Sequence, residues 1–340
     1  MPIESEAPPN SDSALGRFLF NPRTFAALLT ATFFGFPVLY VVQPVLVAPP
    51  SRVFPPVDCA LLEADVRVLA QPGVPRDYLH AERLDETAFW IKGKLEATGA
   101  RVSEQAYTVQ SRTYRNVVAR FGPETGALVV VGAHYDVCGP NPGADDNASG
   151  VAGLLALARM LGQHPPAYPV ELVAFTLEEP PFFRTGHMGS AHHAQGLASR
   201  KTQVKAMVCL EMIGTFSGEA GSQRYPVPGL DLIYPDKGNF IAVIGGIGHG
   251  NLARKVKGAM QSASPLPVWS MNAPAGMTGI DFSDHVNYWK EGIPAVMVTD
   301  SAFYRNRRYH TVQDTPEHLD YVRMGQVVQG VFAAVQILGE

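Results

Sequence analysis

Beyond residue 57, the chain alternates between segments with helical periodicity and short runs of apolar residues. Apolar positions recur at helical spacing in DCALLEADVRVLAQ (58–71) and AERLDETAFWIKGKLEATG (81–99). The short apolar runs are rich in valine and other residues that favour strands. The pattern predicts further helices at about 149–161, 188–200 and 317–338, and strands at 102–110, 114–121, 127–134, 169–177, 206–213, 240–245 and 295–299.

The central strands are apolar at nearly every position, which is typical of strands buried on both faces between helices. Strands that alternate with helices are joined by right-handed crossovers and form a largely parallel sheet. The sequence therefore predicts an α/β fold, a three-layer sandwich with a mostly parallel mixed sheet flanked by helices. We expect one domain over residues 57–340, with 114–121 forming a hairpin with the strand before it.

The N-terminal part has a different character. Residues 24–42 contain no charged side chain, and a helix needs roughly 20 apolar residues to cross a bilayer. Arg17 and Arg23 precede this run and no further basic residue follows until Arg52, so the positive-inside bias places the N-terminus in the cytoplasm. A cleaved signal peptide and a buried or interfacial helical hairpin broken at Pro37 are the alternatives.

This pattern predicts four parts of the chain. We expect a disordered cytoplasmic lead at 1–23, a transmembrane signal anchor at 24–46, a stiff Pro-rich linker at 47–56 and a catalytic domain at 57–340. The catalytic domain would then lie outside the cytoplasm, in the periplasm or the extracellular space.

Charge and cysteine content exclude some classes of protein. The formal net charge of −4 argues against a nucleic-acid-binding protein, which needs a basic face to neutralise phosphates. The three cysteines are scattered and include no Cys-x-x-Cys pair, so neither a disulfide framework nor a thiolate zinc site is expected. The sequence does not indicate an oligomeric state.

Side chains that bind metals follow several of the predicted strands. In an open α/β sheet, ligands bind beyond the carboxyl ends of the strands. A buried group of acids is costly unless cations or protons neutralise it, so their recurrence at these positions indicates a metal site. The candidates are His134 and Asp136 after one strand, Glu178 and Glu179 after the next, Glu211 after a third, and Asp145, Asp146 and His310 in loops.

Five segments carrying these residues occur in a characteristic order: GAHYD, GADDNASG, FTLEE, LEMIG and YHTVQDT. The chain resembles the co-catalytic di-zinc aminopeptidases in this order and spacing, over roughly residues 120–320. That family includes secreted bacterial leucyl-type aminopeptidases, with glutaminyl cyclases and glutamate carboxypeptidases as relatives. Each segment alone is weakly specific, but five in order with every ligand type retained are strongly specific.

The resemblance implies a role for each residue. His134 and Glu211 would hold one zinc, Glu179 and His310 the other, and Asp146 would bridge both. Further matches assign Glu178 as general base, Tyr309 as the support of the oxyanion, Asp136 as the carboxylate that orients His134, and a cis peptide at Asp146–Asn147.

The chain departs from the family's pattern at two places. Glu211 stands where aspartate is common in the best-known members, which bears on metal spacing and substrate preference. The turn EEPPFFRTGHMGS replaces a Gly-Leu-rich one. Glutamate reaches one methylene further than aspartate, so it should still bind the metal, and the turn is interpreted as a feature of a subfamily.

The residue types suit zinc chemistry, because histidine nitrogen and carboxylate oxygen are zinc ligands and a carboxylate can bridge two cations. Two metals about 3.5–4 Å apart would share the attacking water, and Glu178, which binds neither, would take its proton. We therefore expect an aminopeptidase with two zinc ions that hydrolyses peptides with a free N-terminus. A one-zinc glutaminyl-cyclase-like acyl transferase, a dipeptide-type carboxypeptidase and a non-catalytic binding ectodomain remain alternatives.

A few residues have weaker support. His285, in DFSDHVNYW, resembles a recurrent family segment and is a candidate for lining the substrate side of the site. Asp145 is either a supporting carboxylate or a turn former. The Arg-rich segment YRNRRYH (304–310) could bind a substrate carboxylate or form a solvated loop.

Overall fold

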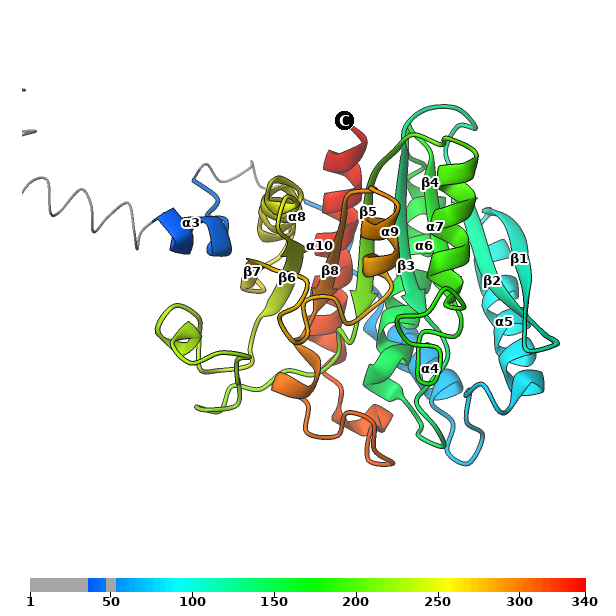
Figure 1. Ribbon diagram of the computed structural model, residues 1–340, viewed down its shortest axis with the longest axis horizontal. Helices are drawn as coiled ribbons and strands as arrows, with labels where there is room; N and C mark the ends of the chain where they lie inside the picture. Colours follow the sequence, from blue (N-terminus) through cyan, green and yellow to red (C-terminus); the bar gives the residue numbers. More distant parts are fainter. Residues whose placement is uncertain (1–35, 47–52) are drawn as a thin grey trace, which may run out of the picture.

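The computed structural model describes residues 36–46 and 53–340. Within these ranges the chain forms an eight-stranded sheet with helices on both faces (Figure 1). The strands are β1 (Arg101–Val109), β2 (Arg112–Phe121), β3 (Leu128–His134), β4 (Val170–Phe175), β5 (Val204–Glu211), β6 (Ile241–Gly246), β7 (Val268–Ala273) and β8 (Ala295–Thr299). The helices are α3 (Phe36–Val42), α4 (Cys59–Leu69), α5 (Ala81–Glu96), α6 (Gly150–Gln163), α7 (Gly189–Ser199), α8 (Gly250–Ala263), α9 (His285–Lys290) and α10 (Tyr321–Gly339).

The strand order is β1-β2-β4-β3-β5-β8-β6-β7. The four central strands β4, β3, β5 and β8 are mutually parallel, whereas β2 and β6 run antiparallel to them. β1 forms the predicted hairpin with β2, and β7 pairs in parallel with β6 at the other edge. The predicted α/β fold with a mixed sheet flanked by helices is therefore confirmed.

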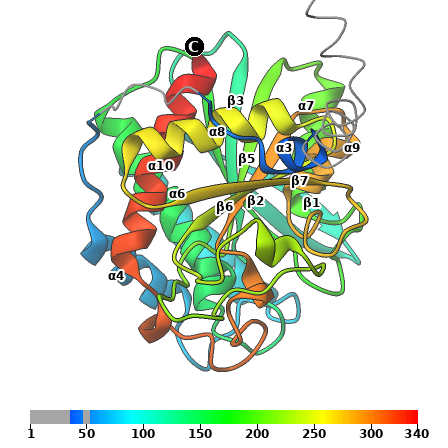
Figure 2. The ribbon, with the colours of Figure 1, turned by 90° about the vertical axis from the view of Figure 1, so that its left-hand side faces the viewer.

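Successive residues of the central strands pack into two separate apolar cores. In β3, Val129 and Val131 belong to the core beneath α4, α5, α6, α8 and α10. Leu128 and Val130 point to the opposite face, into the core that includes residues of α7 and α9. Figure 2, which faces the β7 edge, shows α8 and α10 on one side of the sheet and α7 and α9 on the other. Burial on both faces explains why the central strands read as continuous apolar runs.

Some elements differ from the predicted ones. The C-terminal helix begins at Tyr321 rather than 317, because a short turn of 3-10 helix occupies Pro316–His318. Helix α8, strand β7 and helix α9 were not predicted. In α8 the buried residues Ala253, Val256 and Met260 recur at helical spacing, a signal that was present in the sequence but carried by few large apolar residues. The strand VWSMNA is a short run that mixes polar and apolar residues, so its period of two does not stand out.

In the described part of the chain, no helix combines the length and the apolar character needed to cross a membrane. Much of the predicted anchor at 24–46, namely residues 24–35, lies outside the described residues, as do the predicted lead at 1–23 and part of the linker. The described end of the anchor segment contains the seven-residue helix α3. The carbonyl of Val42 accepts hydrogen bonds from Ser270 Oγ at 2.6 Å and Lys257 Nζ at 2.9 Å, so the end of α3 lies against β7 and α8.

Candidate metal centre

The carboxyl ends of the three neighbouring strands β4, β3 and β5 bring the predicted metal-binding side chains together. His134 is the last residue of β3 and is completely buried, and Glu211 is the last residue of β5. Glu178 and Glu179 follow β4 and are also buried. Because these strands are parallel and adjacent, their final residues reach the same edge of the sheet.

Three side chains form a first ligand group. His134 Nε2 lies 3.5 Å from Asp146 Oδ1 and 3.3 Å from Glu211 Oε2. The ligand atoms of these three residues all lie within 4.8 Å of one another. Asp146 comes from the kinked turn Ala144–Ser149, which follows β3 and leads into α6 and in which the backbone of Asp146 itself is not helical. This loop returns a carboxylate to the strand end that the chain has just left.

A second group uses the other oxygen of the same aspartate. His310 Nε2 lies 3.1 Å from Asp146 Oδ2 and 3.2 Å from Glu179 Oε2. Asp146 thus presents one carboxylate oxygen to each histidine. The structure also groups the Cys138 thiol with Glu179 and His310, a neighbour that the sequence pattern did not indicate.

The spacing and the missing hydrogen bonds fit a bound cation. A tetrahedral zinc with ligand bonds of about 2.0–2.1 Å holds its ligand atoms about 3.3 Å apart, which matches the separations in both groups. The buried atoms His134 Nε2, His310 Nε2 and Glu179 Oε1 have no hydrogen-bond partner among the residues that the structure describes. Buried polar atoms without partners are rare in native proteins, so these donor atoms are suited to metal coordination.

The electrostatics of the cluster point the same way. Burial, together with neighbouring carboxylates, raises the pKa of Glu179 to about 8 and that of Glu178 well above its ordinary value. Burial would lower the pKa of His134, but the carboxylates of Glu211 and Glu178 outweigh it and raise that pKa. With all of its carboxylates ionised, the cluster would hold more negative charge than its histidines neutralise, and a bound cation would relieve that excess.

The carboxylate of Asp136 fixes the backbone of Glu178 and Glu179. Its Oδ1 accepts the backbone N–H of Glu178 and its Oδ2 that of Glu179, each at 3.1 Å. His134 Nδ1 lies 3.1 Å from the backbone carbonyl of Asp136 and 3.6 Å from its carboxylate. Asp136 thus contacts His134 mainly through its main chain, while its carboxylate orients the two glutamates.

Asp145 and Asp314 support the loop that carries Asp146. The buried carboxylate of Asp145 accepts hydrogen bonds from Gly214 N at 3.0 Å, Thr215 Oγ1 at 2.5 Å and Asn306 Nδ2 at 2.8 Å. The carboxylate of Asp314 accepts the backbone N–H groups of Asp145 and Asp146 at 3.1 Å. The peptide after Asp146 is cis, as the resemblance implied.

Tyr309 and His285 occupy different positions relative to the cluster. The Tyr309 ring stacks on His310 with 3.8 Å between centroids, and it lines the neighbouring cavity. His285 is fully buried, its Nε2 lies 2.8 Å from the Ile280 carbonyl, and it is absent from that cavity's lining. Instead, the nearby Ser283 donates a hydrogen bond of 2.7 Å to Glu211 Oε2.

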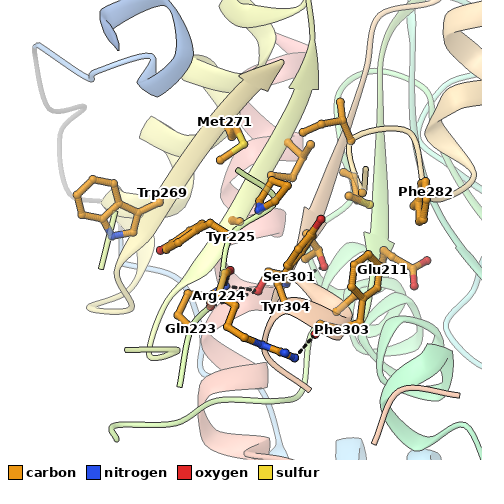
Figure 3. Close-up of a pocket in the computed structure, with 18 of the residues that line it drawn as sticks. Glu211, Gln223, Arg224, Tyr225, Trp269, Met271, Phe282, Ser301, Phe303 and Tyr304 are labelled. Atoms are coloured by element: carbon orange, nitrogen blue, oxygen red, sulfur yellow. Dashed lines mark hydrogen bonds between the residues drawn. The ribbon is translucent and has the colours of Figure 1, made fainter. Parts of the chain in front are cut away.

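A mainly apolar cavity adjoins the cluster. Glu211 and Tyr309 form part of its wall. In Figure 3, Glu211 and Phe282 lie toward one end of this cavity and Trp269 toward the other. The remaining wall is largely aromatic or apolar and includes Tyr225, Tyr234, Phe240, Ile244, Met271, Met297 and Phe303.

Two supporting residues had no sequence signal of their own. Arg76 is completely buried and donates to the carbonyls of Tyr135, Pro142 and Gly143, which flank the ligand loop. Ser283 lies in a segment that drew attention only for His285. Asp314, by contrast, lies inside the YHTVQDT segment, whose match to the family pattern could have indicated it.

Histidines and carboxylates thus lie around a shared aspartate at the ends of parallel strands in an α/β sheet. This arrangement defines a centre of the metallohydrolase type. The family model described as Peptidase family M28 matches residues 116–335. The chain therefore belongs to peptidase family M28, and the predicted family is confirmed. At the level of the family, it is a hydrolase of the zinc aminopeptidase class.

Individual relatives agree with this membership. The chain is 50% identical over 278 residues to the uncharacterized protein YfbL of Escherichia coli, covering 79% of this chain and 85% of that protein. It is 28% identical over 243 residues to aminopeptidase YwaD of Bacillus subtilis, but this covers 69% of this chain and only 47% of that protein.

Solved structures share the fold. LapB of Legionella pneumophila superposes with a TM-score of 0.67 at 22% identity, covering 83% of this chain and 72% of that one. A glutaminyl cyclase of Bacteroides thetaiotaomicron superposes with a TM-score of 0.63 at 19% identity, covering 83% and 98%. At these identities the similarity establishes the fold and not a shared reaction.

Proposed function

We propose that this protein is a two-zinc aminopeptidase that releases N-terminal residues from peptides. The observation that carries the proposal is the position of Asp146, whose two carboxylate oxygens face two separate histidine–glutamate pairs. This arrangement suits a carboxylate that bridges two cations. His134 and Glu211 would hold one zinc, and Glu179 and His310 the other.

Zinc at these positions would lower the pKa of the attacking water and polarise the carbonyl of the scissile bond. Glu178 would act as general base. In support, its Oε2 lies 4.0 Å from His134 Nε2, and it is outside both proposed ligand pairs, although its carboxylate also groups with His134 and Glu179. The base accepts a proton from the water as the new C–O bond forms. It then returns that proton to the leaving amine as the C–N bond breaks.

Two further groups would act on the substrate. The Tyr309 hydroxyl can donate a hydrogen bond to the developing oxyanion, because burial, reinforced by the nearby carboxylates, raises its pKa and keeps it protonated. The cavity beside Glu211 would accept the side chain of the N-terminal residue. Its largely aromatic and apolar wall favours large apolar side chains over charged ones.

Glu178→Gln tests the assignment of the base. The variant should retain its zinc and lose about 10²–10⁴-fold of its turnover, as is typical when a general base is removed. Hydrolysis of aminoacyl-p-nitroanilides measures turnover, and metal mass spectrometry of the intact protein measures zinc. Near-wild-type activity in this variant would remove Glu178 as the base.

The same two measurements test the proposed function as a whole. We expect two zinc ions per chain and release of apolar N-terminal residues. One zinc together with cyclisation of N-terminal glutaminyl peptides would favour the acyl transferase instead. Two bound zinc ions without release from any aminoacyl substrate would refute the aminopeptidase.

We also propose the predicted membrane anchor at 24–46, with the catalytic domain at 57–340 outside the cytoplasm. Support comes from the uncharged run in the sequence and from the exposure of Leu39. Because Val42 is hydrogen-bonded to β7 and α8, the part that spans the membrane would precede it. Cell fractionation should recover the full-length protein with membranes, and protease added outside the cytoplasm should digest the catalytic domain. Recovery in the soluble cytoplasmic fraction would refute this location.

A further inference from the structure

A second depression, distinct from the apolar cavity, opens between the loop that follows β5 and the loop that follows β8. It encloses about 610 Å³. Its walls consist mainly of residues 215–224 on one side and residues 305–318 on the other. We refer to it as the basic cleft, because its lining includes Arg224, Arg305, Arg307, Arg308 and His318, with Glu219 as its acidic residue.

Arg305 is a built-in part of this cleft. Only 6% of its surface is exposed, and its Nε donates to Gln223 Oε1 at 2.9 Å. Its Nη1 donates to the carbonyls of Thr215 at 3.0 Å and Phe240 at 2.8 Å, whereas Nη2 has no hydrogen-bond partner in the described part of the chain. A buried guanidinium nitrogen without an acceptor is unusual, and this one belongs to a residue that lines the basic cleft.

The other arginines of the basic cleft have unused charge. Arg307 is exposed and Arg308 half-buried, and no carboxylate within residues 36–46 or 53–340 forms an ion pair with either guanidinium. Arg224 donates one hydrogen bond, to the carbonyl of Phe303 at 2.8 Å. Glu219 alone among the lining residues opposes these charges, so the basic cleft is positive overall.

The basic cleft adjoins the proposed substrate path. Arg224 lines both the basic cleft and the apolar cavity that contains Glu211 and Tyr309. Arg308 precedes the Tyr309–His310 pair by one residue, so the two sites share one loop. A peptide held at the metal centre by its N-terminal residue must direct its remaining residues away from the apolar cavity. The basic cleft is the positively charged region next to that route.

We propose that the basic cleft binds a carboxylate of the peptide substrate beyond the scissile bond, and that the preferred source is the C-terminal carboxylate of a short peptide. Arginine is suited to this role because its planar fork matches a carboxylate in two parallel hydrogen bonds. The protein would then prefer short peptides with a free C-terminus. This inference rests on the proposed aminopeptidase function.

The test compares free acids with C-terminal amides. Leu-Gly, Leu-Gly-Gly, Leu-Gly-Gly-Gly and their amides are assayed with the zinc-loaded full chain. At the length that reaches the basic cleft, kcat/KM should be about tenfold higher for the acid, since a charge-assisted bidentate contact is lost in the amide. An amide peptide with an internal aspartate tests the alternative source of the carboxylate.

Two double variants show which arginines cause a preference for free acids over amides. Arg307→Ala/Arg308→Ala should bring the acid-to-amide ratio close to one while leaving hydrolysis of leucine p-nitroanilide, which has no such carboxylate, unchanged. Arg254→Ala/Lys255→Ala on α8 removes the same charge from outside the basic cleft and should keep the ratio. Equal loss in both variants would mean a general charge effect and would overturn the proposal.

Binding distinguishes failure of this inference from failure of the proposed function. Calorimetry with the Glu178→Gln protein measures the affinity of Leu-Gly-Gly and of its amide without turnover. A protein that hydrolyses nothing but binds the acid more tightly would refute the aminopeptidase and leave the basic cleft supported. Equal affinity for acids and amides at every length, together with equal kcat/KM where hydrolysis occurs, would refute carboxylate binding by the basic cleft. A preference for the internal aspartate that disappears in Arg307→Ala/Arg308→Ala would support carboxylate binding, with a side chain as its source.

Discussion

Replacing Arg76 should destabilise the fold and loosen the metal centre together. Arg76 lies between α4 and α5, and only 1% of its surface is exposed. Its guanidinium donates to the carbonyls of Tyr135 at 2.9 Å, Pro142 at 3.0 Å and Gly143 at 3.1 Å, and also to that of Leu69. It therefore connects α4 to the end of β3 and to the loop that carries the shared aspartate.

The size of the effect follows from these contacts. In Arg76→Met, the carbonyls of three buried residues and that of the half-buried Pro142 lose a charged donor, at about 1.5–3 kcal/mol each. Against this, burial lowers the pKa of Arg76 from 12.5 to about 10, which corresponds to about 3 kcal/mol of unfavourable desolvation that the variant no longer carries. Water and local rearrangement will satisfy some of the carbonyls. We expect a net loss of about 3–5 kcal/mol, the range found when one partner of a buried charged contact is removed.

Urea unfolding of the zinc-loaded wild-type and Arg76→Met proteins measures this loss, and mass spectrometry measures the zinc that each retains. Arg76→Lys is the matched control, because it keeps the charge but cannot span four carbonyls, so its loss should be intermediate. An Arg76→Met protein within about 1 kcal/mol of wild type, a change ordinary for surface sites, and with full zinc content would refute the reasoning.

Three further predictions concern other parts of the fold. The carboxylate of Asp314 accepts two backbone N–H groups, and the amide in Asp314→Asn is a poorer acceptor. This variant should bind zinc about 10–100-fold more weakly in a chelator competition, as is typical when contacts that support metal ligands are lost. Unchanged zinc affinity would contradict the prediction. Gly122→Ala would place a Cβ 2.3 Å from the Tyr168 carbonyl oxygen, at a backbone φ of +75°. Gly73 has the same φ but open space around it, so Gly73→Ala is the matched control. In urea unfolding, only Gly122→Ala should lose more than about 2 kcal/mol of free energy of unfolding. Burial lowers the pKa of Lys257 from 10.5 to about 8, so the unfolded chain binds more protons between these pH values and wild-type stability gains with rising pH there. The stability of Lys257→Met should lack this increase with pH. Parallel profiles of Tm against pH in the two proteins would contradict the prediction.

The sequence predicts the centre of the fold well and its periphery less well, for a physical reason. Strands such as β3 and β4 are buried on both faces, so their residues must be apolar throughout, and this signal survives in the sequence alone. The elements β7 and α8 lie toward one edge of the sheet, where polar residues are tolerated; α8 keeps its helical periodicity, but few of its apolar residues are large. Their existence depends on tertiary packing.

The candidate site shows the same division. Side chains at strand ends, such as His134 and Glu211, could be predicted to meet because the topology of a parallel sheet brings them together. Contacts that depend on loop conformation could not be predicted from the sequence. Arg76 reaches residues 59 to 67 positions away, and Ser283 donates to Glu211 across 72 positions. His285, selected because its segment resembles a recurrent family segment, lies with its ring against Trp289 and its Nε2 beside a backbone carbonyl.

The order of the ligands along the chain has a consequence for biosynthesis. His134, Asp146 and Glu211 have all been synthesised about a hundred residues before His310. Translation at about 5–20 residues per second makes that interval about 5–20 s. Strand β8, which pairs with β5 beside Glu211, and the Asp314 carboxylate that fixes the backbone of Asp146 arrive in the same late stretch. A nascent or truncated chain therefore lacks His310, one of the five proposed metal ligands, so under the proposed function the order of synthesis delays proteolytic competence until the chain is nearly complete.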